Sequence, residues 1–239
     1  MRYLLVLLFA VVCQAAVGHC EIEVDLDGDG RPEKVRVEGK TLEGPLVAFS
    51  RKGNRRWQID HHVVTRECYA LTLFGRKGIA ILPHGMALRF YTPTGAWGSP
   101  WTYIDLYSFY TASWQGGLIQ ADINGDGLPD LFCGNYWLES PKTFDLPWRL
   151  YAINAFHETP VSATAQLHWD GKRLLWVESR SQRGRVVWFT PPKDIHQLWT
   201  PSPHVLNGRL DCPQLKLRNG QPVITAAKKR PLANPSINN

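Results

Sequence analysis

The segment "DINGDGLPDLFCGNYWLE" (residues 122–139) decides the fold of this 239-residue chain. It opens with Asp, Asn and Asp at alternating positions, continues with a glycine and a fourth oxygen-bearing side chain, and ends in an apolar and aromatic run. A turn of this kind beside a β-rich run is typical of a hairpin. A second copy, "DLDGDGRPEKVRV" (residues 25–37), stands near the N-terminus. Two copies predict a fold built from repeated hairpins.

Five segments share the strand, turn and strand pattern. They are "CEIEVDLDGDGRPEKV", "CYALTLFGRKGIAIL", "LIQADINGDGLPDLF", "TAQLHWDGKRLLWV" and "CPQLKLRNGQPVIT". We expect their turns at Gly30, Gly78, Gly127, Gly171 and Gly220, which lie 44 to 49 residues apart. No stretch between them has a useful helical period, so the chain is predicted to be all-β.

The second half of each unit also repeats. An aromatic β-rich segment leads through a Gly or Pro turn to Trp57, Trp101, Trp148 or Trp199. Each unit therefore has four short strands in roughly 45 to 50 residues, the size of a propeller blade. The fifth unit breaks off after two strands, near Arg230. The prediction is a β-propeller of five blades, each of about four short antiparallel strands, with the last blade incomplete.

Stacking such sheets in a ring buries their faces, and the repeated aromatics are expected between the blades. The expected pairs are Phe49 with Trp57, Phe90 with Trp101, Trp137 with Trp148, and Trp188 with Trp199. A sugar-binding platform is the alternative for these tryptophans. Their recurrence at one place in every unit favours a role in the core.

The acidic turns predict two metal sites. Oxygen ligands from side chains and one backbone carbonyl suit a hard cation, and calcium takes six to eight of them. The expected ligands are Asp25, Asp27, Asp29, the carbonyl of Arg31, and Glu33 in one loop, and Asp122, Asn124, Asp126, the carbonyl of Leu128, and Asp130 in the other. The alternative is an ion-free turn, because Asp, Asn and Gly also form plain turns. The other three turns lack this ligand set.

These two loops resemble the calcium loops of the FG-GAP/VCBS repeat family, which includes exported bacterial proteins and the integrin alpha-chain propeller. The resemblance covers residues 120–148 and 22–37 and is weak elsewhere. It implies calcium at the two loops and roles in scaffolding and recognition. Propellers of the integrin type generally have seven blades, whereas this chain has room for about five.

The N-terminus carries an export signal. After Arg2, the apolar run "YLLVLLFAVV" has the length of a signal-peptide core and is too short to span a bilayer. Cleavage is expected before His19. The expected organisation is therefore a signal peptide at 1–18, one propeller domain at 19–230 and a flexible tail at 231–239, in an exported protein without a lipid anchor or a transmembrane segment.

Four cysteines stay in the chain after cleavage and would meet an oxidising compartment. Their spacing matches no zinc or redox motif. In a closed ring Cys212 of the last unit lies beside Cys20 of the first, so we expect a Cys20–Cys212 bridge. The competing pair is Cys20 with Cys68.

The formal net charge is +6, and the basic residues are spread along the chain without the density of a nucleic-acid arm. The predicted function is a binding or protein-interaction module, with an unidentified protein or polysaccharide ligand held on loops at one end of the ring or in the axial depression. The alternative is a glycosidase or polysaccharide lyase. The acids outside the calcium loops, Asp105, Glu139, Asp145 and Glu158, lie in no motif that fixes a catalytic role.

Overall fold

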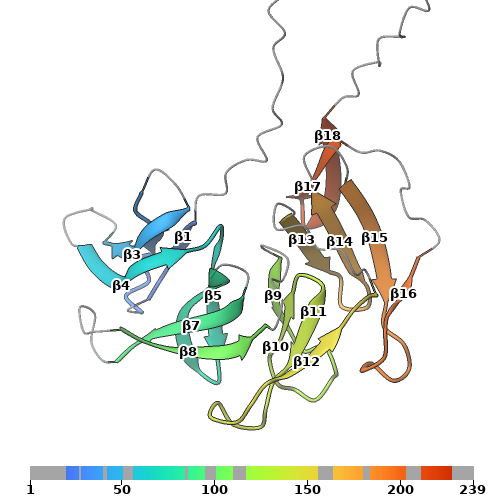
Figure 1. Ribbon diagram of the computed structural model, residues 1–239, viewed down its shortest axis with the longest axis horizontal. Coiled ribbons are helices and arrows are strands. Elements are labelled where there is room, and N and C mark those ends of the chain that lie inside the picture. The colour runs from blue at the N-terminus through green and yellow to red at the C-terminus, as the bar shows by residue number, and fades with distance from the viewer. Residues whose placement is uncertain are drawn as a thin grey trace, which may run out of the picture.

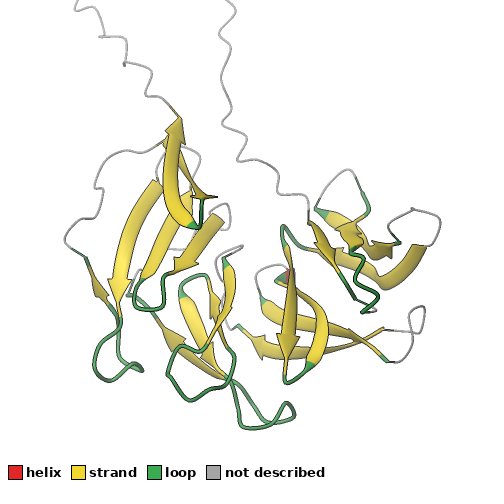
Figure 2. Cartoon of the chain, turned by 180° about the vertical axis from the view of Figure 1, so that it is seen from behind, coloured by secondary structure: helices red, strands yellow, loops and turns green. Residues whose placement is uncertain are grey.

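The computed structural model describes residues 20–26, 28–39, 42–50, 56–83, 86–94, 101–109, 117–155, 164–179, 184–202 and 211–227. The predicted signal peptide and C-terminal tail lie outside these ranges. Within them the protein is all-β, and Figure 2 shows strands and loops with almost no helix. Nowhere in these ranges does a helix reach the length and apolarity that crossing a bilayer requires.

The strands form five antiparallel sheets in chain order. Sheet 1 contains β1 (Glu21–Val24), β2 (Glu33–Val37), β3 (Glu43–Phe49) and β4 (Arg56–Val64). Sheet 2 contains β5 (Cys68–Leu73), β6 (Arg76–Ile81), β7 (Ala87–Pro93) and β8 (Trp101–Ser108). Sheet 3 contains β9 (Leu118–Ala121), β10 (Asp130–Cys133), β11 (Tyr136–Glu139) and β12 (Arg149–Ala152). Sheet 4 contains β13 (Thr164–Trp169), β14 (Leu174–Ser179), β15 (Gly184–Thr190) and β16 (Thr200–Pro201). Sheet 5 has only β17 (Asp211–Arg218) and β18 (Gln221–Ala227).

The five sheets stand side by side in an arc. Figure 1 shows sheet 1 at one end and sheet 5 at the other, with the first strand of each sheet toward the middle. Side chains tie these inner strands together: Gln120 of β9 bonds both backbone groups of Thr72 in β5, at 2.8 and 3.3 Å. Gln166 of β13 accepts the N–H of Leu215 in β17 at 2.8 Å. The four units of four strands and the short fifth unit match the sequence prediction.

Each of the three middle sheets uses its two faces for two different neighbours. In β6, Ile79 and Ile81 join the core between sheets 1 and 2, while Ala80 between them joins the core between sheets 2 and 3. In β14, Trp176 packs toward sheet 3 and Leu175 toward sheet 5. Successive residues of a strand point to opposite faces, so a central strand buried on both faces reads as a continuous apolar run.

Trp148 and Trp199 are buried in these cores and Trp101 packs against one of them, whereas Trp57 is half-buried and belongs to none of the four clusters. The expected pairing within units two to four is wrong. Trp148 is buried in the cluster of sheets 2 and 3, whereas Trp137 is buried in the cluster of sheets 3 and 4. Trp199 of unit four likewise packs back on Phe132 of sheet 3, with ring centroids 5.7 Å apart. In units two to four the last tryptophan therefore fastens its sheet to the preceding sheet.

One predicted turn is displaced. Gly78 lies inside β6, and the hairpin between β5 and β6 turns at Phe74 and Gly75, with φ of 50° and 76°. The hairpin between β17 and β18 turns in the same way at Asn219 and Gly220, with φ of 51° and 75°. Two positive φ values define the tight turn that suits the twist of paired strands. The "RKG" sequence resembles a turn, but the register places Leu73 opposite Arg76 and leaves Gly78 in the strand.

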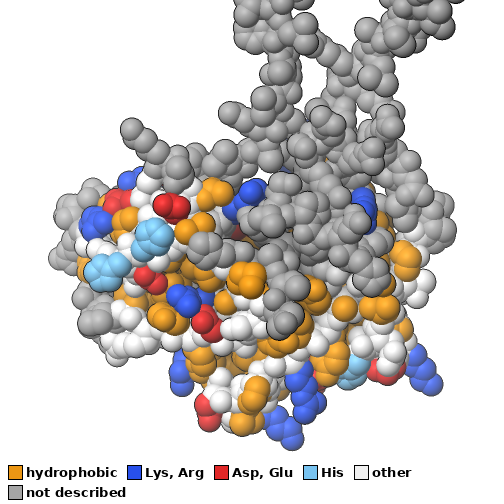
Figure 3. Space-filling model, in the orientation of Figure 1, with side chains coloured by type: hydrophobic (Ala, Val, Ile, Leu, Met, Phe, Trp, Pro, Cys, Tyr) orange, Lys and Arg blue, Asp and Glu red, His pale blue; other side chains and the backbone are white. Residues whose placement is uncertain are grey.

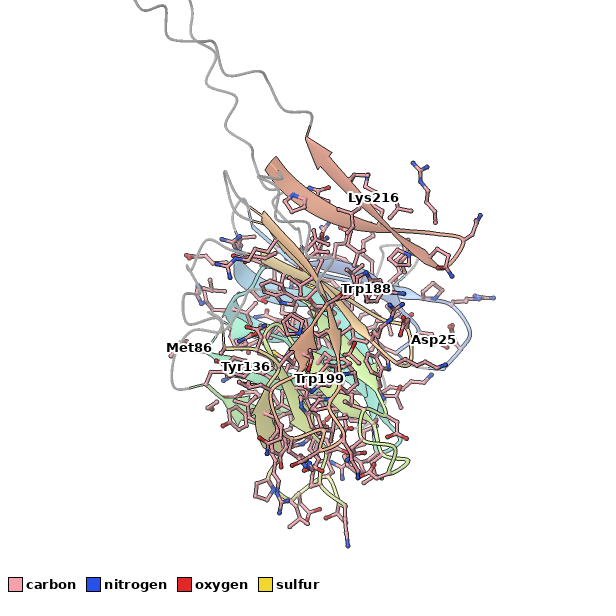
Figure 4. All side chains as sticks on the ribbon, turned by 90° about the vertical axis from the view of Figure 1, so that its right-hand side faces the viewer. Asp25, Met86, Tyr136, Trp188, Trp199 and Lys216 are labelled. Carbon is pink, nitrogen blue, oxygen red and sulfur yellow. A yellow bond between two sulfur atoms is a disulfide. The ribbon has the colours of Figure 1, made fainter. Side chains whose placement is uncertain are left out.

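The two end sheets have polar outer faces. In sheet 1 the face away from sheet 2 carries Lys34, which pairs with Glu21 at 2.8 Å, and Arg36, which lies over the Phe49 ring at 4.6 Å. In sheet 5, Leu215 packs on sheet 4, so its neighbour Lys216 in β17 faces outward (Figure 4). Among the described residues the four core clusters link consecutive sheets, and none of them links sheet 5 to sheet 1.

The expected Cys20–Cys212 bridge is wrong, because Cys20 forms a disulfide with Cys68. Their Cα atoms are 5.1 Å apart, and the two cysteines stand at the beginnings of the inner strands of sheets 1 and 2. Cys133 is a buried thiol in β10. The side chain of Cys212 lies outside what the structure describes. The disulfide therefore fastens two neighbouring sheets instead of closing the arc.

Candidate functional site

The two acidic loops have the same internal hydrogen bonds. Asp25 accepts the N–H groups of the third and fifth residues after it, at 2.7 and 3.1 Å. Asp122 does the same at 2.8 and 3.0 Å. Asp29 and Asp126 each accept the N–H two residues further on, at 2.7 and 2.8 Å. Asp27, the remaining acid of the first loop, lies outside the described residues.

The last acid of each loop reaches back to the loop's beginning. Glu33 accepts the N–H of Leu26 at 2.9 Å, and Asp130 accepts the N–H of Ile123 at 3.0 Å. Both acids are buried. Burial raises the pKa of Asp130, against the lowering effect of three backbone N–H groups. These carboxylates therefore hold the ends of each loop together at the beginning of the second strand.

The donor set suits calcium in chemistry, because carboxylate, amide and carbonyl oxygens are its preferred ligands. Hydrogen bonds from neighbouring side chains also occupy some of these oxygens. The Asn124 amide nitrogen lies 3.2 Å from Asp126 and 3.1 Å from Glu139. No group of three His, Cys, Asp or Glu side chains in the described ranges is arranged to hold a metal ion. The Asn124 side chain would have to turn its oxygen toward the two acids to become a ligand.

Glu139 connects the second loop to sheet 4. Its Oε1 atom, which accepts from Asn124, also lies 3.5 Å from Nε2 of His196 in the loop between β15 and β16. Tyr151 donates its hydroxyl to the other Glu139 oxygen at 3.3 Å, and its ring centroid lies 4.5 Å from that of His196. The sequence offered no motif for these contacts, since their members come from two loops and two strands.

Both acidic loops lie at one end of their inner strands. Figure 4 shows Asp25 at one edge of the molecule and Met86, in a loop between second and third strands, at the opposite edge. A cavity of about 360 Å³ lies at the other end of the inner strands, where four sheets converge. Its walls are formed by Glu21, Glu67, Cys68, Tyr69, Gly117, Leu118, Ala165, Gln166 and Leu167.

Glu67 is the titratable group at this cavity that sequence reasoning missed. Its Oε2 atom accepts the Tyr69 hydroxyl and, at 3.3 Å, the N–H of Gly117. Desolvation by burial raises the pKa of Glu67, against the lowering effect of the Tyr69 hydrogen bond. Only its position in the repeat could have identified Glu67. It stands just before β5, the inner strand of its unit, and such a position faces the centre that the units share.

The described acids that were considered as catalytic candidates do not line this cavity. Asp105 pairs with Arg89 at 2.7 Å within sheet 2, and Glu139 makes the contacts described above. Asp145 is exposed in the loop between β11 and β12, and Glu158 lies outside the described ranges. Asp105 and Glu139 are therefore held by separate partners, one in sheet 2 and the other in sheet 3.

Comparison with known protein families, with curated proteins and with solved structures found no match to this chain.

Proposed function

We propose that this protein is an exported, calcium-stabilised binding module in which the five sheets are the blades of a propeller with an incomplete fifth blade. Three features support this arrangement. The sheets follow one another in chain order, their inner strands surround a common centre, and each inner pair of sheets shares a face-to-face core. Four-stranded units of this size are the repeat of a propeller.

Calcium at the two loops is the central part of the proposal. One observation carries it: loops 97 residues apart have matching hydrogen bonds at each of three acidic positions. In the proposed sites calcium would be held by Asp25, Asp27, Asp29, Glu33 and the carbonyl of Arg31, and by Asp122, Asn124, Asp126, Asp130 and the carbonyl of Leu128. Bound calcium would offset the repulsion between acids that the turn brings together. Its role would be structural, because the loops lie at the opposite end of the inner strands from the cavity beside Glu67, Tyr69 and Gln166, which we call the axial cavity.

Membership of the FG-GAP/VCBS family is part of the same proposal. It rests on the two loops and on the strand, turn and strand context that surrounds each of them. Sheets 2, 4 and 5 have hairpins without the ligand set, so a shared ancestry would require that these repeats have lost theirs.

Export is supported by the cysteines as well as by the leader sequence. A disulfide between Cys20 and Cys68 persists in an oxidising compartment and is rare in the cytosol. Cys20 is the second residue after the proposed cleavage point. The mature chain would therefore begin beside its own disulfide.

A binding role fits the surface better than a role in nucleic-acid recognition. Figure 3 shows acidic and basic side chains interspersed with hydrophobic ones on the face that it presents. Such a mixed surface lacks the one-sign field that nucleic-acid binding uses. The ligand proposed is a protein or a polysaccharide.

Thermal unfolding in calcium, in magnesium and in chelator tests the calcium proposal. Exported modules bind calcium with dissociation constants of about 10⁻⁴ to 10⁻³ M, so about 1 mM calcium would stabilise two sites by about 1 to 3 kcal/mol. We expect chelation to lower the melting temperature by several degrees and calcium to restore it better than magnesium. Equal melting temperatures in calcium and chelator, with no metal in the purified protein, would refute it.

A further inference from the structure

The axial cavity combines groups from four inner strands that lie far apart in the sequence. Glu21 belongs to β1, Tyr69 to β5, Leu118 to β9 and Gln166 to β13. Its volume of about 360 Å³ lies within the range of small-ligand sites. All four contributions come from the first half of their strands, so the cavity lies at the end opposite the acidic loops.

Two polar side chains at this cavity keep unused hydrogen-bonding capacity. Glu67 uses Oε2 for Tyr69 and Gly117, and its Oε1 atom has no partner among the residues that the structure describes. Gln166 uses its oxygen for the N–H of Leu215, and its Nε2 donors have no partner in those ranges. The cavity thus offers one carboxyl acceptor and one amide donor from different sheets.

The charge of the walls selects against ions. Among the residues that the structure describes, no Lys, Arg or His lines the cavity, so the described walls offer no cation to pair with an anionic ligand. Glu21 is already paired with Lys34 at 2.8 Å. A cation would lose its hydration shell on entering, and the carboxyl left to bind it is that of Glu67. Burial favours the uncharged form of this carboxyl, which would compensate a cation poorly. A neutral ligand avoids both costs.

The remaining walls are apolar or aromatic. Leu118, Ala165 and Leu167 supply aliphatic surface, and Tyr69 supplies a ring whose hydroxyl is held by Glu67. A neutral ligand for this site must therefore carry hydroxyl groups for an acceptor and a donor, together with C–H surface for the walls. A pyranose has both on one small ring.

We propose that the axial cavity binds one neutral saccharide residue, with Glu67 accepting one sugar hydroxyl and Gln166 donating to another. This inference rests on the proposed function in one respect, since it specifies the ligand of the binding module. It does not depend on calcium at the loops.

Calorimetric titration of the wild-type mature protein with glucose, galactose, mannose and N-acetylglucosamine tests the inference directly. Glucosamine and glucuronate serve as the positively and negatively charged counterparts of glucose. We expect at least one neutral sugar to bind and the charged counterparts to bind more weakly. Absence of binding by all four neutral sugars, or tighter binding of a charged one, would overturn the inference.

Two conservative variants test the assigned residues. Glu67→Gln keeps an oxygen for Tyr69 and Gly117 and replaces the second carboxyl oxygen, the proposed acceptor, by an amide donor. Gln166→Glu keeps the oxygen for Leu215 and removes the donor. Each variant should weaken sugar binding by about tenfold, because that is the change in affinity expected when one hydrogen bond to the sugar is lost. Gln120→Glu is the matched control, because Gln120 bridges inner strands in the same way outside the cavity. Unchanged affinity in both cavity variants, or an equal loss in the control, would contradict the assignment.

The calcium melting experiment separates this inference from the proposed function. Sugar binding without a calcium shift would refute the calcium proposal alone. A calcium shift without sugar binding would refute the saccharide site alone.

Discussion

Cys20 and Cys68 stand at the beginnings of two adjacent inner strands, and their disulfide closes a loop across 48 residues of sequence. Because both cysteines lie in the core of sheets 1 and 2, the bridge joins the N-terminal edge of the protein to its second sheet.

Replacing Cys20 and Cys68 by serine should destabilise the protein strongly. A disulfide that closes a loop of this length stabilises the folded state by about 4 kcal/mol. In a chain of this size, each kcal/mol changes the melting temperature by about 2 to 4 °C. We expect the melting temperature to fall by about 8 to 16 °C. Peptide mapping under non-reducing conditions should recover Cys20 joined to Cys68, and a peptide joining Cys20 to Cys212 would contradict the structure.

Phe74 occupies a left-handed backbone conformation that a bulky residue rarely adopts, and its ring packs edge-on against Phe144 and Trp148 of sheet 3. Phe74→Asn would relieve about 1 kcal/mol of backbone strain but lose this aromatic packing. We expect a net loss of about 1 to 2 kcal/mol in denaturant unfolding. Asn219→Phe is the converse test at the equivalent turn, and it should cost about 1 kcal/mol because no aromatic partner is provided there. A stabilised Phe74→Asn protein would show that the ring contributes nothing.

Gly78 is required by a close approach of backbone inside sheet 2. A Cβ atom there would lie 2.2 Å from the carbonyl oxygen of Tyr91 and 2.6 Å from the Phe90 ring. Gly78→Ala should therefore cost about 3 kcal/mol or more. Gly171→Ala meets open space and strains only its turn, where φ is 88°, at about 1 to 2 kcal/mol. Similar losses in the two variants would contradict the register of β6 and β7.

Ionisation of Glu67 should destabilise the folded protein. Its folded pKa is raised above the ordinary value of 4.5, so the folded state binds this proton more tightly than the unfolded state. The contribution to stability is present at low pH and is lost as pH rises through the folded pKa. Glu67→Gln removes this titration, and its melting temperature relative to wild type should therefore rise as the pH increases above the ordinary value of 4.5. A constant difference across this range would show that Glu67 is not desolvated.

Asp126→Ala should remove one of the two proposed calcium responses. It deletes a carboxylate from the second loop, and the calcium-induced rise in melting temperature should fall by about half. Asp170→Ala is the control, because Asp170 accepts two backbone N–H groups in the hairpin of sheet 4 without a ligand set around it. Asp170→Ala should lower stability in calcium and in chelator equally. A full calcium response in Asp126→Ala would remove that loop from the proposal.

The division into four-stranded units was predictable because strand alternation and turn chemistry act over a few residues. The two acidic loops were predictable as turns for the same reason, because their matching hydrogen bonds depend on their own sequence. Contacts between segments that are distant in the sequence were harder to predict. Cys20 has competing partners in the sequence, and only the packing of sheet 1 on sheet 2 selects Cys68. Glu67 has no local signature, because its cavity is made by strands from four units. Gly78 was predicted to form a turn but lies inside β6. A single glycine in the sequence is compatible with a turn and also with a strand whose backbone lies close to its neighbour.

The polar outer faces of sheets 1 and 5 have a consequence for how the molecule opens. Each sheet is supported by its immediate neighbours, as in a linear array, so unfolding can start at an end and stop at an interior boundary. The core between sheets 4 and 5 has only three buried side chains in the described ranges, Leu175, Val177 and Val186, whereas sheets 1 and 2 share a larger core and a disulfide. Amide hydrogens of β17 and β18 should therefore exchange well before those of β6 and β10. The C-terminal hairpin would then act as a separately melting unit on a body that stays folded.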